Sequence, residues 1–274
     1  MLVKLTSKKL WKQFVPFAGG VFTVTTFAYT FLPVTIFQEI KLEILLGTVM
    51  FLIIVFVVLL VHANNLTSRK FRINETDVIV KFGDLFSEDG VKVIAFNEYF
   101  DTKVDNKIIC ESSLNGSYIN ECVSNVSDLD ETISNTVPQE NIMGYTTDRK
   151  NGGKSTKYKL GTICPTEEYF LLALTHFDEE NKANLVVKEY VSCLFTMWDE
   201  LNKYYNGRKI VLPLLGGGIT RFNDSNINES ELLDYILMTF RASKISFRNP
   251  SSLTIVLRKD LSDKISIYNI NDNK

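Results

Sequence analysis

Three consecutive glycines near residue 217 form the part of the sequence best suited to hold a phosphate group. The segment 210–215 is apolar, and the loop after it consists of Gly216, Gly217, Gly218, Ile219, Thr220, Arg221 and Phe222. Because glycine has no Cβ, consecutive backbone N–H groups there can turn toward a diphosphate. Arg221 would add positive charge, or would cap a helix. A strand followed by three glycines is equally typical of a tight connection, so the residues alone leave both interpretations open.

A second glycine pair, in Gly152-Gly153-Lys154-Ser155, is similar to the end of a P-loop. That motif needs a glycine five positions before its Gly-Lys pair, where this chain has Asp148. It also needs an apolar strand just upstream, where this chain has the mixed segment 141–147. We therefore reject a nucleotide-triphosphatase loop. The polar stretch 146–155 is instead predicted to be a mobile surface loop.

The cysteines and histidines do not indicate a metal centre or a nucleophilic triad. The four cysteines, at 110, 122, 164 and 193, show neither a CxxC spacing nor a pairing pattern, which favours reduced thiols. Of the two histidines, His62 ends an apolar run and His176 stands alone in the globular part. The sequence therefore predicts no catalytic residue, no metal site and no cofactor.

The elements that must position these residues alternate between strands and helices. Short β-rich runs predict buried strands at 78–82, 91–96, 170–175, 210–214 and 253–257. Apolar residues at helical spacing predict helices over 187–201 and 232–240, the second starting at Asn228 or Ser230. Such alternation favours an α/β layer sandwich with a mostly parallel sheet. Ligands bind beyond the carboxyl ends of its strands, which is where the loop 216–222 lies.

The first 70 residues are of a different kind. No charged residue occurs in 13–38 or in 44–68, and the run 44–61 alone would cover about 27 Å as a helix. We predict a transmembrane hairpin over residues 1–70, with spans at about 14–37 and 44–62. A signal peptide fits poorly, because the first run is long, has no small-residue cleavage site and is followed by a second span. A buried helical pair would not normally need such uncharged runs.

Charge gives the hairpin an orientation. Residues 1–72 hold eight Lys or Arg and two Glu, a net charge of +6, while residues 73–274 carry −8. The positive residues flank the two spans, and the expected connecting loop 38–43 has only Lys41 between two glutamates. The positive-inside rule places both termini and the globular part, 71–274, in the cytoplasm. The net negative charge of the globular part argues against non-specific binding of nucleic acid.

One face of the first span combines small and hydroxylated residues. Gly19, Thr23, Thr26 and Thr30 recur at helical spacing, and such faces let transmembrane helices approach closely. Packing against the second span of the same chain is one interpretation. Self-association between subunits, or a polar pathway between them, is the other.

Several segments together resemble a macrodomain. They are the turn Gly83-Asp84-Leu85, the strand end Ala95-Phe96-Asn97, the loop 113–117 (SLNGS) and the strand and loop 213–222, which occur in the expected order. The segments 160–162 and 169–175 with 214–222 are similar to the divergent macrodomain of Thoeris anti-phage effectors. One branch of that family places two transmembrane helices before it. The resemblance covers essentially the whole chain and implies a three-layer α/β sandwich with a mixed, mostly parallel sheet.

The resemblance also implies a ligand of the ADP-ribose type. Asp84 would accept a hydrogen bond from the adenine amino group, and residues 216–222 would cradle the diphosphate. Gly116 and Ser117 would lie on its other side, and Asn97 near the distal ribose. This chain departs from the family pattern, because Asn97 is followed by Glu-Tyr-Phe rather than ending an NAAN segment, and the first loop has one glycine. These departures weaken an enzymatic interpretation.

The function implied is that of a membrane effector in the bacterial inner membrane. Its macrodomain would bind an ADP-ribose-derived signal, expected to be a histidine conjugate made by a TIR-domain partner. Binding would drive oligomerisation and disrupt the lipid bilayer, arresting the infected cell. A membrane-tethered ADP-ribosyl hydrolase is the alternative. A third hypothesis is an ion-conducting or structural membrane protein whose globular part regulates assembly.

Overall fold

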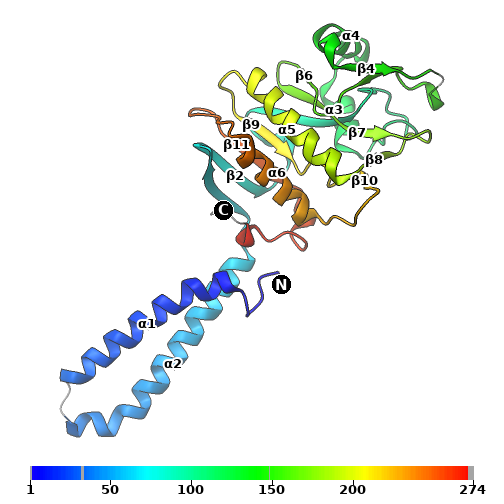
Figure 1. The fold of residues 1–274 in the computed structure, drawn as a ribbon. Helices are drawn as coiled ribbons and strands as arrows, with labels where there is room; N and C mark the ends of the chain where they lie inside the picture. Colours follow the sequence, from blue (N-terminus) through cyan, green and yellow to red (C-terminus); the bar gives the residue numbers. More distant parts are fainter. Residues whose placement is uncertain (1, 32–33, 148, 271–274) are drawn as a thin grey trace. The chain divides into compact units, whose positions relative to one another are not determined.

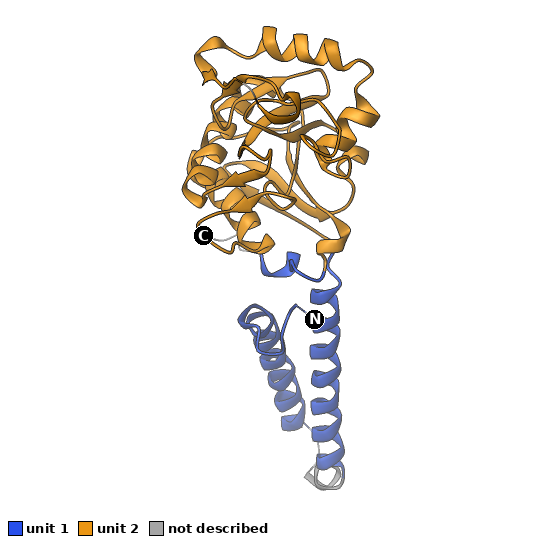
Figure 2. Ribbon diagram, turned by 90° about the vertical axis from the view of Figure 1, so that its right-hand side faces the viewer, with its two compact units in different colours: residues 1–67, 263–271 blue, residues 68–262, 272–274 orange. Residues whose placement is uncertain are grey.

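The computed structural model describes residues 2–31, 34–147 and 149–270. The chain divides into two compact units (Figure 2). One unit holds Met1–Thr67 together with Asp263–Asn271, and the other holds Ser68–Ser262. The sequence predicts a division after residue 70, with the C-terminal segment in the globular part. In the structure that segment instead groups with the N-terminal helices.

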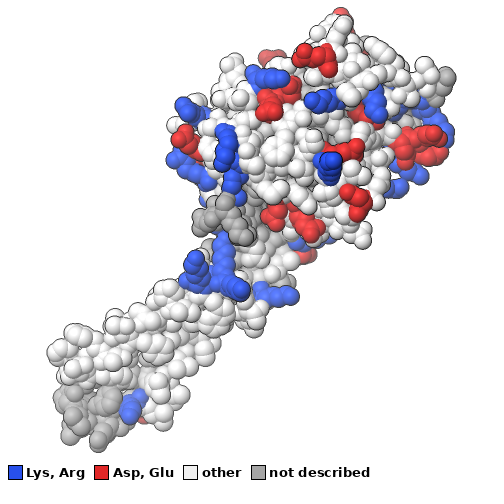
Figure 3. Space-filling model, in the orientation of Figure 1, with Lys and Arg blue, Asp and Glu red and all other residues white. Residues whose placement is uncertain are grey.

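The first unit is a pair of helices, α1 (Lys8–Phe31) and α2 (Val34–Asn64), both long and apolar enough to cross a membrane. Helix α2 includes residues 34–37 of the expected first span and the expected loop 38–43. Gln, Glu, Lys and Leu are good helix formers, so the charges of 38–43 do not end the helix. The hairpin surface shown in Figure 3 is almost free of charged side chains.

The chain ends of this unit pack together on the two helices. Val3, Leu10, Leu60, Ala63 and Tyr268 form a small buried cluster. Asn64 ties the N-terminal segment to α2, since its Oδ1 accepts a hydrogen bond from the Val3 N–H (3.0 Å) and its Nδ2 donates to the Val3 carbonyl (3.3 Å). The apolar cluster and these bonds give the unit a packed base.

The second unit is built on one mixed sheet, with strand order β1-β2-β11-β9-β3-β7-β8-β10 and β6 paired to β7 (Figure 1). Neighbours from β2 to β7 in this order are parallel, whereas β1–β2, β6–β7 and β7–β8 are antiparallel. The strands are β1 (Ser68–Ile73), β2 (Thr76–Phe82), β3 (Val91–Asn97), β6 (Ile163–Pro165), β7 (Tyr169–Phe177), β8 (Ala183–Leu185), β9 (Ile210–Pro213), β10 (Arg221–Phe222) and β11 (Leu253–Leu257).

Helices cover both faces of this sheet. On one face, α3 (Leu114–Cys122) and α4 (Val126–Thr136) contribute Tyr118, Ile119, Leu129 and Ile133 to a core shared with the strands. The other face carries α5 (Val187–Tyr204) and α6 (Glu229–Ser243), which pack against each other (Figure 1). The Trp198 indole N–H donates to Thr239 Oγ1 (3.0 Å) between these two helices. The three-layer α/β sandwich with a mixed, mostly parallel sheet is therefore confirmed.

The five predicted strands correspond to β2, β3, β7, β9 and β11, and both predicted helices are present. Asn228 begins α6 with a capping box, in which its side chain accepts from the Glu231 N–H and Glu231 bonds back to the Asn228 N–H. The sequence missed α4 in the polar stretch 123–138, and the hairpin of β4 (Ile142–Tyr145) and β5 (Thr156–Tyr158). These short elements have few apolar residues to reveal their period.

Candidate functional site

A cavity of about 830 Å³ opens at the carboxyl ends of the parallel strands. Its lining comes from the ends of β2, β11, β9, β3 and β7, which are consecutive in the sheet. Four steps between neighbouring strands, each about 4.8 Å, span about 19 Å. The lining residues are therefore spread widely enough along the sheet edge to contact a ligand with two separate ends.

Most of the predicted site residues line this cavity. Asp84 follows β2, Asn97 ends β3, Ser117 lies in α3, and the loop 216–220 follows β9. Arg221 and Phe222 do not line it, because they form β10 and pair in parallel with β8. Gly116 is absent from the lining as well. A Cβ on Gly116 would lie 2.3 Å from the Cys110 carbonyl oxygen, so this glycine permits a close backbone approach.

Asp84 has a structural task at the mouth of the cavity. Its Oδ1 accepts a hydrogen bond from the Phe86 N–H (3.1 Å) and so begins the short 3₁₀ helix Leu85–Ser87. The side chain is exposed. A carboxylate has about four acceptor positions, so this single bond leaves capacity for a ligand donor.

The three glycines of the loop after β9 differ in what they require. Gly216 has φ +79°, a left-handed conformation that favours glycine. A Cβ on Gly217 would lie 2.9 Å from Leu214 Cδ2, whereas a Cβ on Gly218 would meet nothing within 4 Å. The buried Tyr190 hydroxyl donates to the Leu215 carbonyl (2.8 Å) and holds the start of the loop. Phe222 packs edge-on against the Tyr190 ring, so it supports the loop from outside the cavity.

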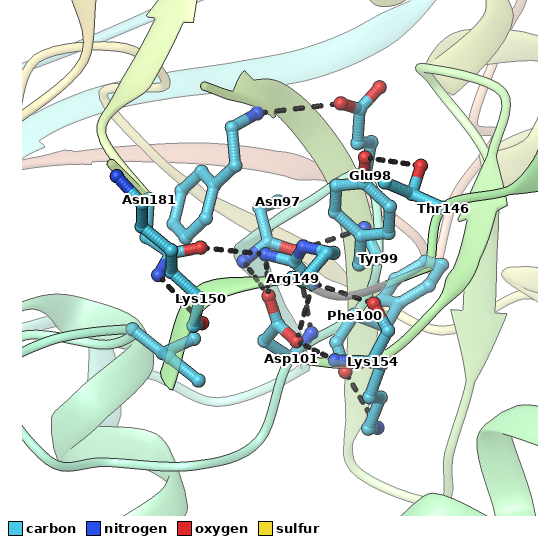
Figure 4. A network of polar contacts seen from close by, with 12 residues as sticks. Asn97, Glu98, Tyr99, Phe100, Asp101, Thr146, Arg149, Lys150, Lys154 and Asn181 are labelled. Carbon is cyan, nitrogen blue, oxygen red and sulfur yellow. Dashed lines mark hydrogen bonds and ion pairs between the residues drawn. The ribbon is translucent and has the colours of Figure 1, made fainter. Parts of the chain in front are cut away.

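The Asn97 side chain is engaged within the protein (Figure 4). Its Nδ2 donates to Asp101 Oδ2 (3.0 Å) and its Oδ1 accepts from the Tyr99 N–H (2.9 Å). Only 3% of the residue is exposed. Asn97 thus fixes the turn that follows β3, and this turn forms part of the cavity wall.

A buried ion pair holds the same turn from the other side (Figure 4). Arg149 and Asp101 are 2.8 Å apart, with side chains only 6% and 1% exposed. Arg149 also donates to the Lys154 carbonyl (2.7 Å) and to Asn181 Oδ1 (3.1 Å), and its guanidinium lies 3.7 Å from the Tyr99 ring centroid. The segment 146–155 is largely exposed, as expected of a surface loop, and the buried Arg149 side chain anchors it at one point. Asp148 lies outside the described residues.

Lys154, the lysine of the rejected P-loop, also has protein partners. Its Nζ donates to the Phe100 carbonyl (2.7 Å) and pairs with Asp130 (2.5 Å). Burial lowers the pKa of Lys154, although Asp130 acts in the opposite direction. The side chain therefore stabilises a loop junction and does not extend toward the cavity lining.

His176 is less isolated than its position in the sequence indicates. Its Nδ1 lies 2.5 Å from Glu98 Oε2, and its Nε2 lies 3.5 Å from Glu189. The hydrogen bond with Glu98 raises the pKa of His176. Lys157 pairs with the same Glu98 at 3.2 Å. Among the residues that the structure describes, no three His, Cys, Asp or Glu side chains gather as a metal site.

The structure adds cavity residues that sequence reasoning missed. Arg258 and Lys259 follow β11 and bring two cations to the lining, with Arg258 also paired to Asp260 at 2.7 Å. Applying the strand-end rule to the last predicted strand would have found them. Asn115 lines the cavity near the start of α3, and its buried Oδ1 has no hydrogen-bond partner among the described residues. No sequence signal distinguishes this asparagine from the many others.

Comparisons with known proteins define the class. Residues 78–258 match the family described as Thoeris protein ThsA, Macro domain. The chain is 40% identical over 235 residues to Thoeris protein ThsA of Bacillus amyloliquefaciens (strain Y2), covering 84% of this chain and 78% of that protein. The chain belongs to the ThsA family of Thoeris defence proteins, and residues 78–258 form its macrodomain.

Solved structures with similar architecture include an Oceanobacillus iheyensis macrodomain with ADP. It is 14% identical, with a TM-score of 0.46, covering 71% of this chain and 90% of that one. The same macrodomain with MES bound is 13% identical, with a TM-score of 0.44, covering 72% and 91%.

Proposed function

We propose that this protein is a membrane-anchored anti-phage effector whose macrodomain binds an ADP-ribose-derived signal. The observation that carries the proposal is the order of groups along the cavity. Asp84 lies at the β2 end, the glycine loop lies after the central β9, and the Asn97 turn lies after β3. This order matches adenine, diphosphate and distal ribose in an extended ligand.

Each region of the cavity suits the chemistry of its part of the ligand. The carboxylate of Asp84 accepts from the adenine amino group. The backbone of Gly216 and Gly218 and the N-terminal end of α3 offer N–H groups to the diphosphate, while the Gly217 N–H donates to the Leu214 carbonyl (3.1 Å). Arg258 and Lys259 add positive charge at the side of β11. ADP-ribose is a ligand in this proposal, and the protein retains it unchanged.

A binding role is favoured over hydrolysis by the carboxylates beside Asn97. A hydrolase needs a general base that reaches water next to the substrate. Glu98 is paired with His176 and Lys157, and Asp101 is paired with Arg149. Neither carboxylate lines the cavity. We therefore propose a receptor rather than an ADP-ribosyl hydrolase.

The helical unit is the effector part of the proposal. Helices α1 and α2 span the bacterial inner membrane, and the flanking positive residues place both termini and the macrodomain in the cytoplasm. A TIR-domain partner supplies the signal, with histidine as the expected group on the distal ribose. Binding favours an oligomer whose hairpins disrupt the bilayer and arrest the infected cell.

The test is binding followed by analysis of the ligand. The full chain in detergent is titrated with ADP-ribose and with its histidine conjugate, and the bound ligand is then released and weighed by mass spectrometry. Tight binding of an intact ligand supports the receptor. Release of ribose products supports the hydrolase, and no binding of either compound contradicts both.

The analogue of ADP-ribose that carries unsubstituted purine in place of adenine is the matched control ligand. It lacks the 6-amino donor and adds no other hydrogen-bond donor for the Asp84 carboxylate. The purine analogue is therefore expected to bind more weakly than ADP-ribose. Equal affinity for both would contradict the proposed position of the adenine.

A further inference from the structure

Within residues 2–270, outside the gaps in the described ranges, both covalent connections between the two units leave the sheet at the edge that carries the cavity. Helix α2 leads into β1, whose first residue, Ser68, is paired with Lys81 near the end of β2. Strand β11 ends at Leu257, which is paired with Phe82, the last residue of β2. Gly83 and Asp84 of the cavity follow directly. A change in the cavity therefore arises within a few residues of both connections.

The C-terminal connection is itself part of the cavity wall. Val256, Arg258, Lys259 and Leu261 all line the cavity, and Asp263 begins the segment that groups with the helices. By contrast, no residue of β1 lines it, since this strand pairs only with β2 at the edge of the sheet. The segment after β11 is therefore the connection that a ligand would touch.

The far end of this segment is fixed to the first transmembrane helix. The Tyr268 hydroxyl donates to Gln13 Oε1 (2.9 Å), and Lys9 Nζ donates to the carbonyls of Tyr268 (2.7 Å) and Ile270 (3.2 Å). Lys9 also lies 5.2 Å from the centroid of the Tyr268 ring. Tyr268 is only 7% exposed and belongs to the apolar cluster with Leu10 and Leu60. Charge-assisted bonds and apolar burial thus hold residues 263–270 on α1 and α2.

We propose that residues 256–270 are the element that couples ligand binding to the transmembrane hairpin. The segment has one end in the cavity wall and the other on α1, and Tyr268 lies ten positions after Arg258. A ligand that changes the position or mobility of 256–261 changes the free energy of the contacts at Lys9 and Gln13. By linkage, a disturbance of those contacts changes the free energy of ligand binding in the cavity by the same amount. This inference rests on the proposed function for the identity of the ligand.

The coupling is tested without a ligand, by hydrogen exchange on the full chain in detergent. The double variant Lys9→Gln with Tyr268→Phe removes the charged and hydroxyl bonds but retains the aromatic ring in its cluster. Lys8→Gln is the matched control, because Lys8 is an exposed neighbour and loses the same charge. The amides of 256–261 should exchange at least about threefold faster in the double variant than in wild type or control.

Two results would overturn the coupling. One is faster exchange confined to 263–270, with 256–261 unchanged, which would show that the contact with α1 is not transmitted. The other is unchanged exchange in both segments, which would show that Lys9 and Tyr268 do not hold the segment. Circular dichroism confirms that the double variant keeps its helices, and exchange in β3 and β7 reports whether the sheet remains folded.

A second arm adds ADP-ribose and separates this inference from the proposed function. ADP-ribose should alter exchange in 263–270 of wild type, and this distant effect should be lost in the double variant while binding persists. If ADP-ribose does not bind wild type, the proposed function fails, and the ligand-free comparison still decides the coupling. If it binds and leaves 263–270 unchanged, the coupling is wrong and the receptor stands.

Discussion

At the scale of single residues, the cavity combines groups that serve folding with groups that remain open to a ligand. Asp84 caps a 3₁₀ turn, and Gly116 and Gly217 permit close contacts with neighbouring groups. Gly218 faces open space and has no such structural task. The same substitution at two of these glycines therefore changes the stability of the fold by different amounts. Each variant is chosen from the contacts of its own position.

Asp84→Ala is expected to weaken ADP-ribose binding by about 1.5–3 kcal/mol, the value of a hydrogen bond to a charged group. Titration calorimetry should show a loss of about ten- to a hundredfold in affinity. Asp89→Ala is the control, because this exposed aspartate pairs with Lys209 and does not line the cavity. If Asp84→Ala melts earlier but binds normally, Asp84 serves only as the cap of its turn.

Gly218→Val is expected to abolish ADP-ribose binding without lowering the melting temperature. The new side chain meets no protein atom within 4 Å of its Cβ, and Gly218 lines the cavity, so the added volume takes the place of the diphosphate. The comparison is Gly217→Val, which should also destabilise the fold because of Leu214. Normal binding by Gly218→Val would exclude the glycine loop as the phosphate site.

At the scale of elements, the β4–β5 region and the turn after β3 are joined by ionic contacts as well as by a backbone bond from the Tyr158 N–H to the Glu98 carbonyl (2.8 Å). Arg149 and Asp101 are buried, and they connect the loop after β4 with the end of β3. His176 of β7 bonds to Glu98, the residue after β3. The end of β3 is therefore fixed from two directions.

Arg149→Met is expected to destabilise the protein by about 3–5 kcal/mol, because it leaves the Asp101 carboxylate buried without its partner. Unfolding of the full chain in urea provides the measurement. Lys150→Met is the matched control, since the pair of Lys150 with Glu180 is more than half exposed and should contribute far less. Equal losses in the two variants would contradict a special role of the buried pair.

The His176–Glu98 contact should make stability depend on pH. The pKa of His176 is raised in the folded protein, chiefly by its bond with Glu98. The contribution is therefore complete below about pH 6.5, the ordinary pKa, and is lost as the pH rises through the raised value. The difference in unfolding free energy between wild type and His176→Gln should shrink as the pH rises. A difference that stays constant or grows would show that the folded pKa is not raised.

At the scale of the whole molecule, the chain joins an apolar helical unit to a charged sandwich. On the face shown in Figure 3, the hairpin is nearly uncharged, while acidic and basic side chains are interspersed on the other unit. Among the residues that the structure describes, nothing lies within 4 Å of a Cβ placed on Gly19, and Thr23, Thr26 and Thr30 are exposed. This favours contact between subunits over packing against α2.

Gly19→Leu with Thr23→Leu is expected to reduce ADP-ribose-induced oligomerisation in detergent while leaving ADP-ribose affinity unchanged. Larger side chains keep neighbouring transmembrane helices apart, and the cavity lies in a different unit. Size-exclusion chromatography with light scattering measures assembly, and Val24→Leu serves as the control because Val24 is already large and 69% exposed. Full assembly of the double variant would exclude this face as the contact between subunits.

Local patterns were sufficient to predict the elements that carry the fold. The period of apolar residues predicted β2, β3, β7, β9, β11, α5 and α6, and the uncharged runs predicted two long apolar helices. The glycines after β9 predicted a loop at the carboxyl edge of the sheet. These features depend on residues that are close in the chain, so composition and spacing are enough to predict them.

Only the tertiary structure decided which residues meet. The partners Arg149 and Asp101 are 48 positions apart, and Tyr268 bonds to Gln13 across 255 positions. Neither pair has a local signal, because the sequence around an arginine, an aspartate or a tyrosine does not indicate whether a distant partner exists. The side chain of Asn97, expected beside the ligand, is instead bound to Asp101, because the chain turns back after β3 and brings this aspartate, four positions further on, against it. The sequence by itself determined the elements and the edge where a ligand fits, while long-range packing decided which side chains remain open to that ligand.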